Sequence, residues 1–596
     1  MPQLKERHAE SFVVLTLFFL SGCSGLIYEV VWLRMLVRAF GSTTFATSTI
    51  LAVFMSGLAA GAWLGGLRSR TAPAPLRSYG IVELGLAVAA ALATWGGREL
   101  PNVVAAFWSE QGAASAMVIV LRASLSFLIL FVPTLLMGAS FPLLAEHFSR
   151  ARNGTRTPGW DRAALLYGVN TVGAVAGVIY SGFLAIGTLG EIKTVAIAVA
   201  INAAVGAGAL ALARRALAPA RAPRADRATS AGHDEAAATP LARGIVWLVA
   251  LSGFCALALE VLWTRMLVLL VGTSVYAFSA MLACYLVGIG IGSLVSARWM
   301  GFDRRRASTF CALQVAAGLL AAATLELYLT QGMARLDGAY LYSPIQSAKD
   351  FLALFGLSAG IIIPVTLVYG MMFPLAIQIA DTRAAGTSVG RIYAFNTVGS
   401  VLGSLACGFV LIPALGTRTT LYLVAFVHIA LGLIGASLNR SAVLKKVALA
   451  GMVPVVLLAV LRPDPFFEII QARLAKRAPG KVLFHDEGLS ATVTGYASRY
   501  ETLLLINGVI VSGIGALGTL MADIPLLLLA HPERALVICL RTGSTFRAAV
   551  EHNVAVHRAR GRPGDRQRRE EFPPDVRLEI RRDRGRRQRP FTARAR

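Results

Sequence analysis

SGCSGLIYEVVWLRML, residues Ser21–Leu36, and SGFCALALEVLWTRML, residues Ser252–Leu267, are the stretches that decide the fold. They match at a constant offset of 231 residues, so that Glu29, Trp32 and Arg34 align with Glu260, Trp263 and Arg265. Each stretch is otherwise apolar and belongs to a run long enough to cross a bilayer. The chain therefore contains two copies of one membrane-spanning unit.

The match continues along both halves. At the same offset Gly41, Gly57 and Gly61 align with Gly272, Gly288 and Gly292, and YGVNTVGAVAG (167–177) later matches YAFNTVGSVLG (393–403). Each half contains an even number of spans, so both halves enter the membrane from the same side. We expect parallel repeats related by an axis along the membrane normal.

The composition excludes a soluble globular protein. Of the 596 residues 56% are hydrophobic and 15% are charged, and the mean hydropathy is +0.65, whereas soluble domains carry about 25% charged residues. The first apolar run is too long for a cleaved signal peptide and another span follows it directly. The apolar runs lie near residues 12–38, 43–66, 79–97, 114–145, 163–187, 193–214, 244–270, 274–299, 308–330, 351–380, 389–412, 418–438 and 443–461.

These runs predict an all-α polytopic membrane protein of two parallel six-helix repeats, with a thirteenth helix as a candidate and a small C-terminal α/β segment. The predicted divisions are residues 1–11, 12–215 (repeat 1), 216–243 (linker), 244–440 (repeat 2), 441–461, 462–556 and 557–596. The six cysteines form no CxxC pair, so the sequence predicts neither a zinc site nor a disulfide framework.

Positive charges set the expected orientation. Loops near Lys5, Arg68, Arg150, Arg304 and Lys445 fall on one side, which we take as cytoplasmic. A thirteenth span would place the C-terminal segment on the opposite side. The sequence leaves open whether that last helix crosses fully.

Two carboxylates stand inside the predicted membrane region. Glu29 and Glu260 lie about two thirds of the way along their helices, where a lipid-facing charge costs a few kcal/mol. They are candidates for a cation or proton site on the pseudo-symmetry axis. The alternative is a structural carboxylate bonded to a neighbouring helix.

Other residues that recur in both halves indicate a functional site less strongly. Arg34 and Arg265 are substrate or ion candidates, or they extend from helix ends to the headgroups, while Trp32 and Trp263 are expected at the membrane interface. Asn170 and Asn396 offer an interhelical hydrogen bond or a ligand contact. The glycine ladders predict close helix packing, at residues Gly57, Gly61, Gly65, Gly173, Gly177, Gly288, Gly292, Gly399 and Gly403.

From Lys481 onward, the long apolar runs give way to an alternating pattern rich in β-branched residues. KVLFHDEGLSATVTGYASRYETLLLINGVIVSG (481–513) reads as strands with a turn near residues 498–500. A helix, a strand at Ala535–Leu540, a turn and another helix follow. Such a turn, with Thr542, Gly543 and Ser544, suits a nucleotide or adenosyl ligand.

Taken together, the E-V-x-W-x-R helix, the doubled six-span unit and the C-terminal ING, HPERALVI and TGSTFRAA stretches resemble a bacterial family. Its members fuse a major-facilitator-like membrane domain to a spermidine-synthase-like domain. The resemblance covers most of residues 12–556. It implies a Rossmann-type aminopropyltransferase domain that takes decarboxylated S-adenosylmethionine as cosubstrate and a polyamine as substrate.

The sequence departs from this family at the synthase site. Where the family has a GGGDGG-type turn, this chain has Cys539–Ser544, with Arg541 where backbone should approach the ligand and Thr542 in place of the acidic residue. Only Asp523 is acidic in the stretch that would grip the polyamine. No residue is therefore assigned as catalytic, and no cofactor is assigned beyond the cosubstrate implied by the resemblance.

The last 40 residues hold 15 arginines and no lysine. A disrupted reading frame in a GC-rich gene and a basic arm for anionic lipid or nucleic acid are both consistent with that bias. No specific nucleic-acid partner is predicted.

Two functions remain open from sequence alone. The first is a spermidine-synthase-like protein of the bacterial inner membrane whose transporter-like domain handles polyamines or another organic cation, with synthase activity lost. The second is an active membrane-tethered spermidine synthase. The lipid bilayer is the expected partner in both, and the oligomeric state is left open.

Overall fold

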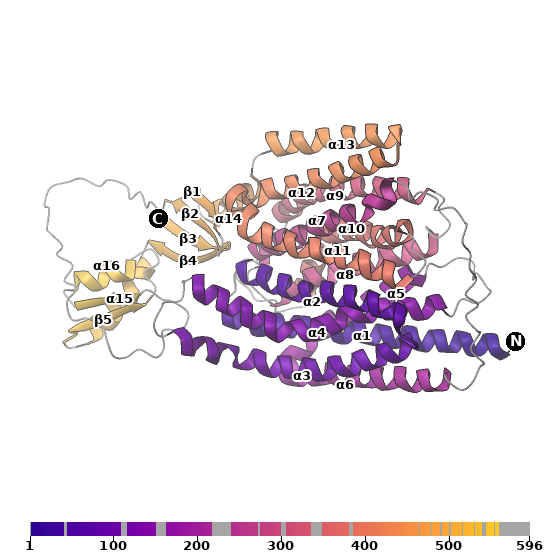
Figure 1. Ribbon diagram of the computed structural model, residues 1–596. Helices are drawn as coiled ribbons and strands as arrows, with labels where there is room; N and C mark the ends of the chain where they lie inside the picture. Colours follow the sequence, from indigo (N-terminus) through magenta and orange to yellow (C-terminus); the bar gives the residue numbers. More distant parts are fainter. Residues whose placement is uncertain are drawn as a thin grey trace.

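The computed structural model describes most of the chain. The described residues are 2–40, 44–108, 116–150, 162–216, 240–271, 275–299, 305–334, 348–380, 385–462, 464–477, 479–488, 491–499, 502–514, 516–529, 531–538, 544–552 and 555–559. Within them the fold is a long bundle of helices with a small mixed segment at one end (Figure 1).

The bundle consists of two halves of six long helices. The first half is α1 (Pro2–Phe40), α2 (Thr44–Thr71), α3 (Pro75–Trp108), α4 (Ala116–Arg150), α5 (Arg162–Ile179) and α6 (Ile186–Ala216). The second is α7 (Pro240–Val271), α8 (Val275–Trp299), α9 (Arg306–Ala334), α10 (Ala348–Ile379), α11 (Ala385–Ala406) and α12 (Ile412–Leu438). The predicted fold class is confirmed: this is a multi-pass membrane protein, with 11 helical stretches in the described residues long and apolar enough to cross a bilayer.

Two of those stretches, 163–214 and 387–438, are 52 residues long. An unbroken helix of that length would measure about 78 Å, more than twice the hydrocarbon thickness. Each is interrupted by a short π-helical segment, η1 (Tyr180–Ala185) or η3 (Cys407–Leu411), and then by a glycine with positive φ, Gly190 (79°) or Gly416 (77°). Glycine adopts this left-handed conformation without the strain of a side chain, so the chain can turn there.

The chain reverses at these glycines. Gly173, before the turn, packs on Phe19, and Gly208, after it, packs on Leu17, so both segments pass the same level of α1. The two long stretches are therefore helical hairpins, as the separate spans predicted from sequence require.

The same helix pairings occur in both halves. In the first half α2 packs on α4, α1 on α5 and α3 on α6; in the second α8 packs on α10, α7 on α11 and α9 on α12. The contacts match in detail, because a β-carbon at Gly22 would overlap the carbonyl of Asn170, and one at Gly253 would overlap the carbonyl of Asn396. The glycine ladders pack against neighbouring backbone in the same way, as their spacing predicted.

The halves meet along two seams. Helix α2 packs on α11, and α5 packs on α8. The Ser293 hydroxyl donates to the carbonyl of Ala164 (2.8 Å), and the Ser404 hydroxyl donates to that of Ser48 (3.2 Å). These contacts leave a space between the halves at mid-membrane.

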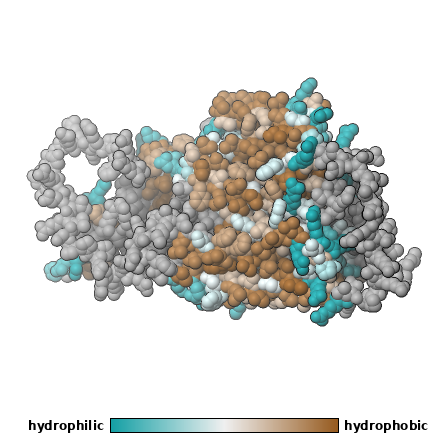
Figure 2. All heavy atoms as spheres, viewed as in Figure 1, coloured by the Kyte–Doolittle hydropathy of each residue, from teal (hydrophilic) through white to brown (hydrophobic). Residues whose placement is uncertain are grey.

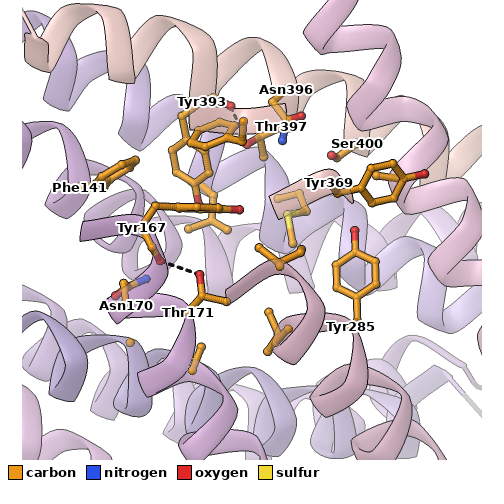
Figure 3. A pocket seen from close by; sticks show the side chains of 18 of the residues that line it. Phe141, Tyr167, Asn170, Thr171, Tyr285, Tyr369, Tyr393, Asn396, Thr397 and Ser400 are labelled. Atoms are coloured by element: carbon orange, nitrogen blue, oxygen red, sulfur yellow. Dashed lines mark hydrogen bonds between the residues drawn. The ribbon is translucent and has the colours of Figure 1, made fainter. Parts of the chain in front are cut away.

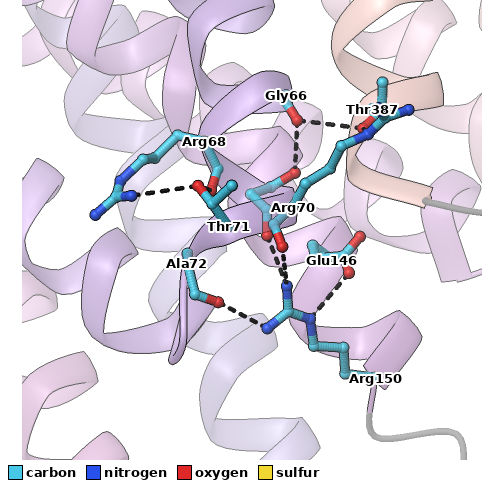
Figure 4. A network of polar contacts seen from close by, with 9 residues as sticks. Gly66, Arg68, Arg70, Thr71, Ala72, Glu146, Arg150 and Thr387 are labelled. Carbon is cyan, nitrogen blue, oxygen red and sulfur yellow. Dashed lines mark hydrogen bonds and ion pairs between the residues drawn. The ribbon is translucent and has the colours of Figure 1, made fainter. Parts of the chain in front are cut away.

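Hydrophilic residues gather at the end of the bundle where the N-terminus lies (Figures 1 and 2). A polar network there links the ends of α2, α4 and α11 (Figure 4). The Arg150 guanidinium donates to the carbonyls of Ala72 (2.7 Å) and Ser69 (2.8 Å) at the end of α2, and pairs with Glu146 (2.9 Å). The Arg70 side chain donates to Thr387 of the other half (2.5 Å).

Helix α13 (Ala442–Leu461) is long and apolar enough to span and packs on α12 and α9. It carries the chain to the end opposite the N-terminus, where α14 (Pro465–Arg477) begins. Phe466 of α14 packs on Tyr328 of α9, whereas Ile470 and Leu474 join the core under the sheet. Helix α14 thus links the bundle to the sheet.

The C-terminal segment contains two sheets. β1 (Gly480–Glu487), β2 (Thr492–Ser498), β3 (Thr502–Ile506) and β4 (Val509–Ile514) form an antiparallel meander in that order. Asn507 and Gly508, both at positive φ, make the two-residue turn that this sequence favours. Beyond α15 (Ala516–Leu528), β5 (Arg534–Ile538) and β6 (Ala555–Ala559) pair in parallel across α16 (Ser544–Glu551).

Candidate functional site

A cavity of about 250 Å³ lies between the two halves at mid-membrane. Helices from both halves line it, and the lining side chains are aromatic, apolar, hydroxyl, amide and carboxylate groups (Figure 3). A concavity that combines apolar and aromatic walls with inward-facing polar groups is typical of a small-molecule site.

Glu29 of α1 and Glu260 of α7 both line this cavity. They are 7% and 3% exposed, so neither faces lipid. Among the described residues neither carboxylate makes a hydrogen bond or an ion pair. The structure thus brings these two sequence candidates together in one cavity.

Asn170 of α5 and Asn396 of α11 also line the cavity (Figure 3). Their backbone carbonyls lie against Gly22 and Gly253, which holds each amide at matched positions in the two halves. Neither side chain has a hydrogen-bond partner among the described residues, so both amides are available to an occupant.

Aromatic rings cover much of the remaining wall. Tyr167 and Phe373 lie with ring centroids 4.6 Å apart, and Phe141 meets Tyr393 edge to face at 6.2 Å. Tyr285 and Tyr369 project into the same space from α8 and α10 (Figure 3). Such a wall offers ring faces to a cation and apolar surface to a hydrocarbon chain.

A third carboxylate, Glu83 of α3, is fully buried and was not predicted from the sequence. It accepts hydrogen bonds from Ser21 (2.7 Å), Ser140 (3.0 Å) and Asn202 (2.5 Å). Ser21 and Ser140 also line the cavity, so a short hydrogen-bonded connection joins Glu83 to it. A lone acidic residue within the apolar run 79–97 was the available signal.

In the second half, a neutral residue stands at the position that matches Glu83. Gln314 aligns with Glu83 and His428 with Asn202. The His428 ring lies between Gln314 Oε1 (2.9 Å at Nδ1) and the Tyr369 hydroxyl (2.7 Å at Nε2). The two halves therefore share a buried polar cluster, but only the first retains a carboxylate in it.

Two predictions about side-chain placement were wrong. Trp32 and Trp263 are buried inside the bundle, not interfacial, and each indole N–H donates to a threonine of the neighbouring helix, Thr94 (3.0 Å) or Thr324 (3.5 Å). The partners explain the burial, because an indole can enter the core once its N–H is satisfied.

Arg34 and Arg265 lie outside the cavity. Arg34 pairs with Glu191 at the start of α6 (3.1 Å) and is partly exposed. Arg265 is buried and does not extend to the headgroups; it binds the C-terminal sheet through the Gly488 carbonyl (3.2 Å) and the Thr492 hydroxyl (2.9 Å). Neither arginine is placed to contact a ligand of the cavity.

The predicted adenosyl-binding turn falls mostly outside the described residues. Arg541, Thr542 and Gly543 are not described, and Ser544 begins α16. Asp523, which the resemblance to the synthase family pointed to as a polyamine contact, pairs with His552 of the turn after α16 (2.9 Å).

No family model matches the chain. Polyamine aminopropyltransferase 1 of Ralstonia nicotianae is 30% identical over 237 residues, which are 38% of this chain and 42% of that protein. Polyamine aminopropyltransferase 2 of the same organism is 30% identical over 214 residues, 34% of this chain and 39% of that protein. The chain thus spans about two fifths of the length of these curated relatives.

Among solved structures, the nucleoside transporter NupG (D323A mutant) aligns with a TM-score of 0.43 at 12% identity, over 72% of this chain and 99% of that one. The helix contacts described above define the fold of this chain independently of that likeness.

Proposed function

We propose that the membrane domain binds a small organic cation, and specifically a polyamine, in the cavity between its halves, and moves it across the bacterial inner membrane. The observation that carries this proposal is the pair Glu29 and Glu260. Two carboxylates line one membrane-buried cavity, and no cationic side chain among the described residues neutralises either.

The negative charge of the cavity is the first argument for this proposal. Burying a carboxylate without a partner is costly, and an incoming cation offsets that cost. A polyamine carries ammonium groups separated by methylene chains. Its ammonium groups match the two carboxylates, and its methylenes match the apolar wall.

The aromatic and amide groups add to this complementarity. An ammonium group is attracted to the faces of rings such as Tyr167 and Tyr393. The amide oxygens of Asn170 and Asn396 can accept hydrogen bonds from it. The similar proteins are polyamine aminopropyltransferases, which favours polyamines over other organic cations.

The test is binding of radiolabelled spermidine and putrescine to the purified chain, followed by uptake into proteoliposomes. Glu29→Gln and Glu260→Gln should each weaken binding at least tenfold, and the double variant should bind no measurable polyamine. Glu99→Gln is the matched control, because Glu99 hydrogen-bonds Asn102 outside the cavity. Unchanged binding in both cavity variants would refute the proposal.

A second candidate, aminopropyl transfer by the C-terminal segment, rests on the names of the same relatives. Within the proposal this activity is lost. Transfer needs an adenosyl-binding turn free of side chains and carboxylates for the amine, whereas the turn sequence contains Arg541 and Asp523 is occupied by His552. Incubation with putrescine and decarboxylated S-adenosylmethionine should give no spermidine; turnover would favour the synthase instead.

A further inference from the structure

Three side chains gather where α14 and β1 meet the end of the bundle. One ligand atom from each of Asp464, His485 and Glu487 lies within 4.8 Å of the other two. We propose that this cluster binds a divalent transition-metal ion, Zn²⁺ or Mn²⁺. The site is separate from the cavity and does not depend on the function proposed for it.

His485 supplies the most specific evidence. Its Nδ1 lies 2.9 Å from the Thr494 hydroxyl on the neighbouring strand β2. Its Nε2 is buried and has no hydrogen-bond partner among the described residues. A buried ring nitrogen without a partner is unfavourable, and a metal-binding histidine typically has its second nitrogen held by such a hydrogen bond.

Glu487 is held in a similar manner. Its Oε2 accepts hydrogen bonds from the backbone N–H (3.0 Å) and the hydroxyl of Thr417, and the Arg265 Nε lies 3.5 Å from the same oxygen. These contacts leave Oε1 for a ligand. Gly416, next to Thr417, has no side chain to fill the space beside that oxygen.

Asp464 completes the set. Its Oδ1 accepts the backbone N–H of Phe466 (3.0 Å) and so caps α14, which leaves Oδ2. Each of the three residues thus uses one polar atom for positioning and retains another for coordination. The cluster has the supporting bonds that pre-arranged metal sites have.

The donor set indicates the class of ion. One imidazole nitrogen with two carboxylate oxygens suits Zn²⁺ or Mn²⁺, whereas Ca²⁺ and Mg²⁺ prefer oxygen alone. Three protein ligands leave coordination positions to water. The nearby Arg265 charge opposes the ion and weakens its binding. Bound metal would fasten β1 to the junction between α13 and α14.

The experiment uses the full chain in detergent, purified through a histidine-free tag and stripped with EDTA. Calorimetric titration with ZnCl₂ and MnCl₂, together with elemental analysis, should give one equivalent of bound metal. Asp464→Asn, which retains the Oδ1 cap, and His485→Ala should each weaken binding at least tenfold. His531→Ala is the matched control, because this exposed histidine lies outside the cluster.

Co²⁺ absorption supplies a second readout, since its visible d–d bands report the number and geometry of the ligands around the ion. The bands should appear in the parent and in His531→Ala and be absent from His485→Ala. If His485→Ala aggregates on gel filtration, the metal binding of Asp464→Asn decides whether the cluster holds the ion. No metal binding by the parent, or equal binding by the parent and both cluster variants, would overturn the proposal.

Discussion

The guanidinium of Arg265 lies 3.5 Å from the carboxylate of Glu487 and so joins the last turns of α7 to the first strand of the C-terminal sheet. In the first half the matched Arg34 pairs with Glu191 of its own bundle. Thr417 stands where Glu191 stands in the other half, and it hydrogen-bonds Glu487. The sheet therefore provides a carboxylate that the second half lacks.

Replacing Arg265 should loosen this junction. Arg265→Ala leaves the buried Glu487 carboxylate without its cationic partner and removes the bonds to Gly488 and Thr492, at a cost of about 3 kcal/mol. We expect faster proteolytic release of the C-terminal segment and a lower apparent melting temperature. Limited trypsinolysis followed by mass spectrometry measures the first effect.

Arg34→Ala is the matched comparison. Its ion pair is partly exposed, with 42% of the arginine side chain accessible, and such pairs contribute about 0–1 kcal/mol. The C-terminal segment should remain protected in this variant. Equal protease sensitivity in the two variants would contradict the conclusion that Arg265, but not Arg34, holds the C-terminal sheet.

The buried cluster around Glu83 leads to a second prediction. Glu83→Ala removes the acceptor shared by Ser21, Ser140 and Asn202, at roughly 1–3 kcal/mol for each donor that finds no other partner or water. Glu83→Gln keeps an acceptor oxygen, and a glutamine, Gln314, already occupies the matched position in the second half. The apparent melting temperature should therefore fall clearly for the alanine variant and only slightly for the glutamine variant.

Both variants are compared by tryptophan fluorescence during heating in detergent. Gln314→Ala serves as the reference for loss of a neutral side chain at the matched site, and it should destabilise less than Glu83→Ala. A Glu83→Gln variant that melts with, or below, Glu83→Ala would mean that the ionised carboxylate itself is required for folding.

Close glycine packing gives a third prediction. A β-carbon at Gly22 or Gly253 would overlap the backbone carbonyl of Asn170 or Asn396, and backbone cannot move aside as a flexible side chain can. Gly22→Ala and Gly253→Ala should each cost about 1–3 kcal/mol. Because they displace the cavity asparagines, they should also weaken polyamine binding. Gly187→Ala, whose β-carbon would meet nothing within 4 Å, should retain stability and binding.

The sequence was sufficient for the helices, their hairpins and the glycine seams, because these depend on local apolar runs and on residues spaced four apart. It could not determine which way single polar side chains point. Trp32 and Trp263 were misplaced for that reason, since the threonines that satisfy their indoles lie on other helices, far along the chain. Arg265 was misjudged similarly, because its partners come from β1 and β2.

The sites were less predictable than the fold. Glu29 and Glu260 stand out because they repeat, whereas Glu83 does not repeat as a carboxylate and was overlooked. His485 and Glu487 are two residues apart on β1, which places them on one face of the strand. Asp464 joins them only through the packing of α14 against β1, which the sequence does not reveal.

The position of the C-terminal sheet leads to the last prediction. Helix α13 begins near Lys446, at the basic end of the bundle, and ends where Arg265 and Thr417 hold the sheet. Since basic ends of membrane bundles face the cytoplasm, the sheet should lie on the opposite, periplasmic side. Lys481 on β1 and Lys446 on α13 are both exposed lysines and mark the two ends.

We expect a membrane-impermeant maleimide to label Lys481→Cys in intact spheroplasts and to leave Lys446→Cys unlabelled, with the six native cysteines replaced beforehand. Lysis should make Lys446→Cys reactive, which shows that its earlier protection came from the membrane. The opposite pattern would place the sheet in the cytoplasm. A cytoplasmic sheet would be within reach of cytosolic solutes, whereas a periplasmic sheet is separated from them by the bilayer.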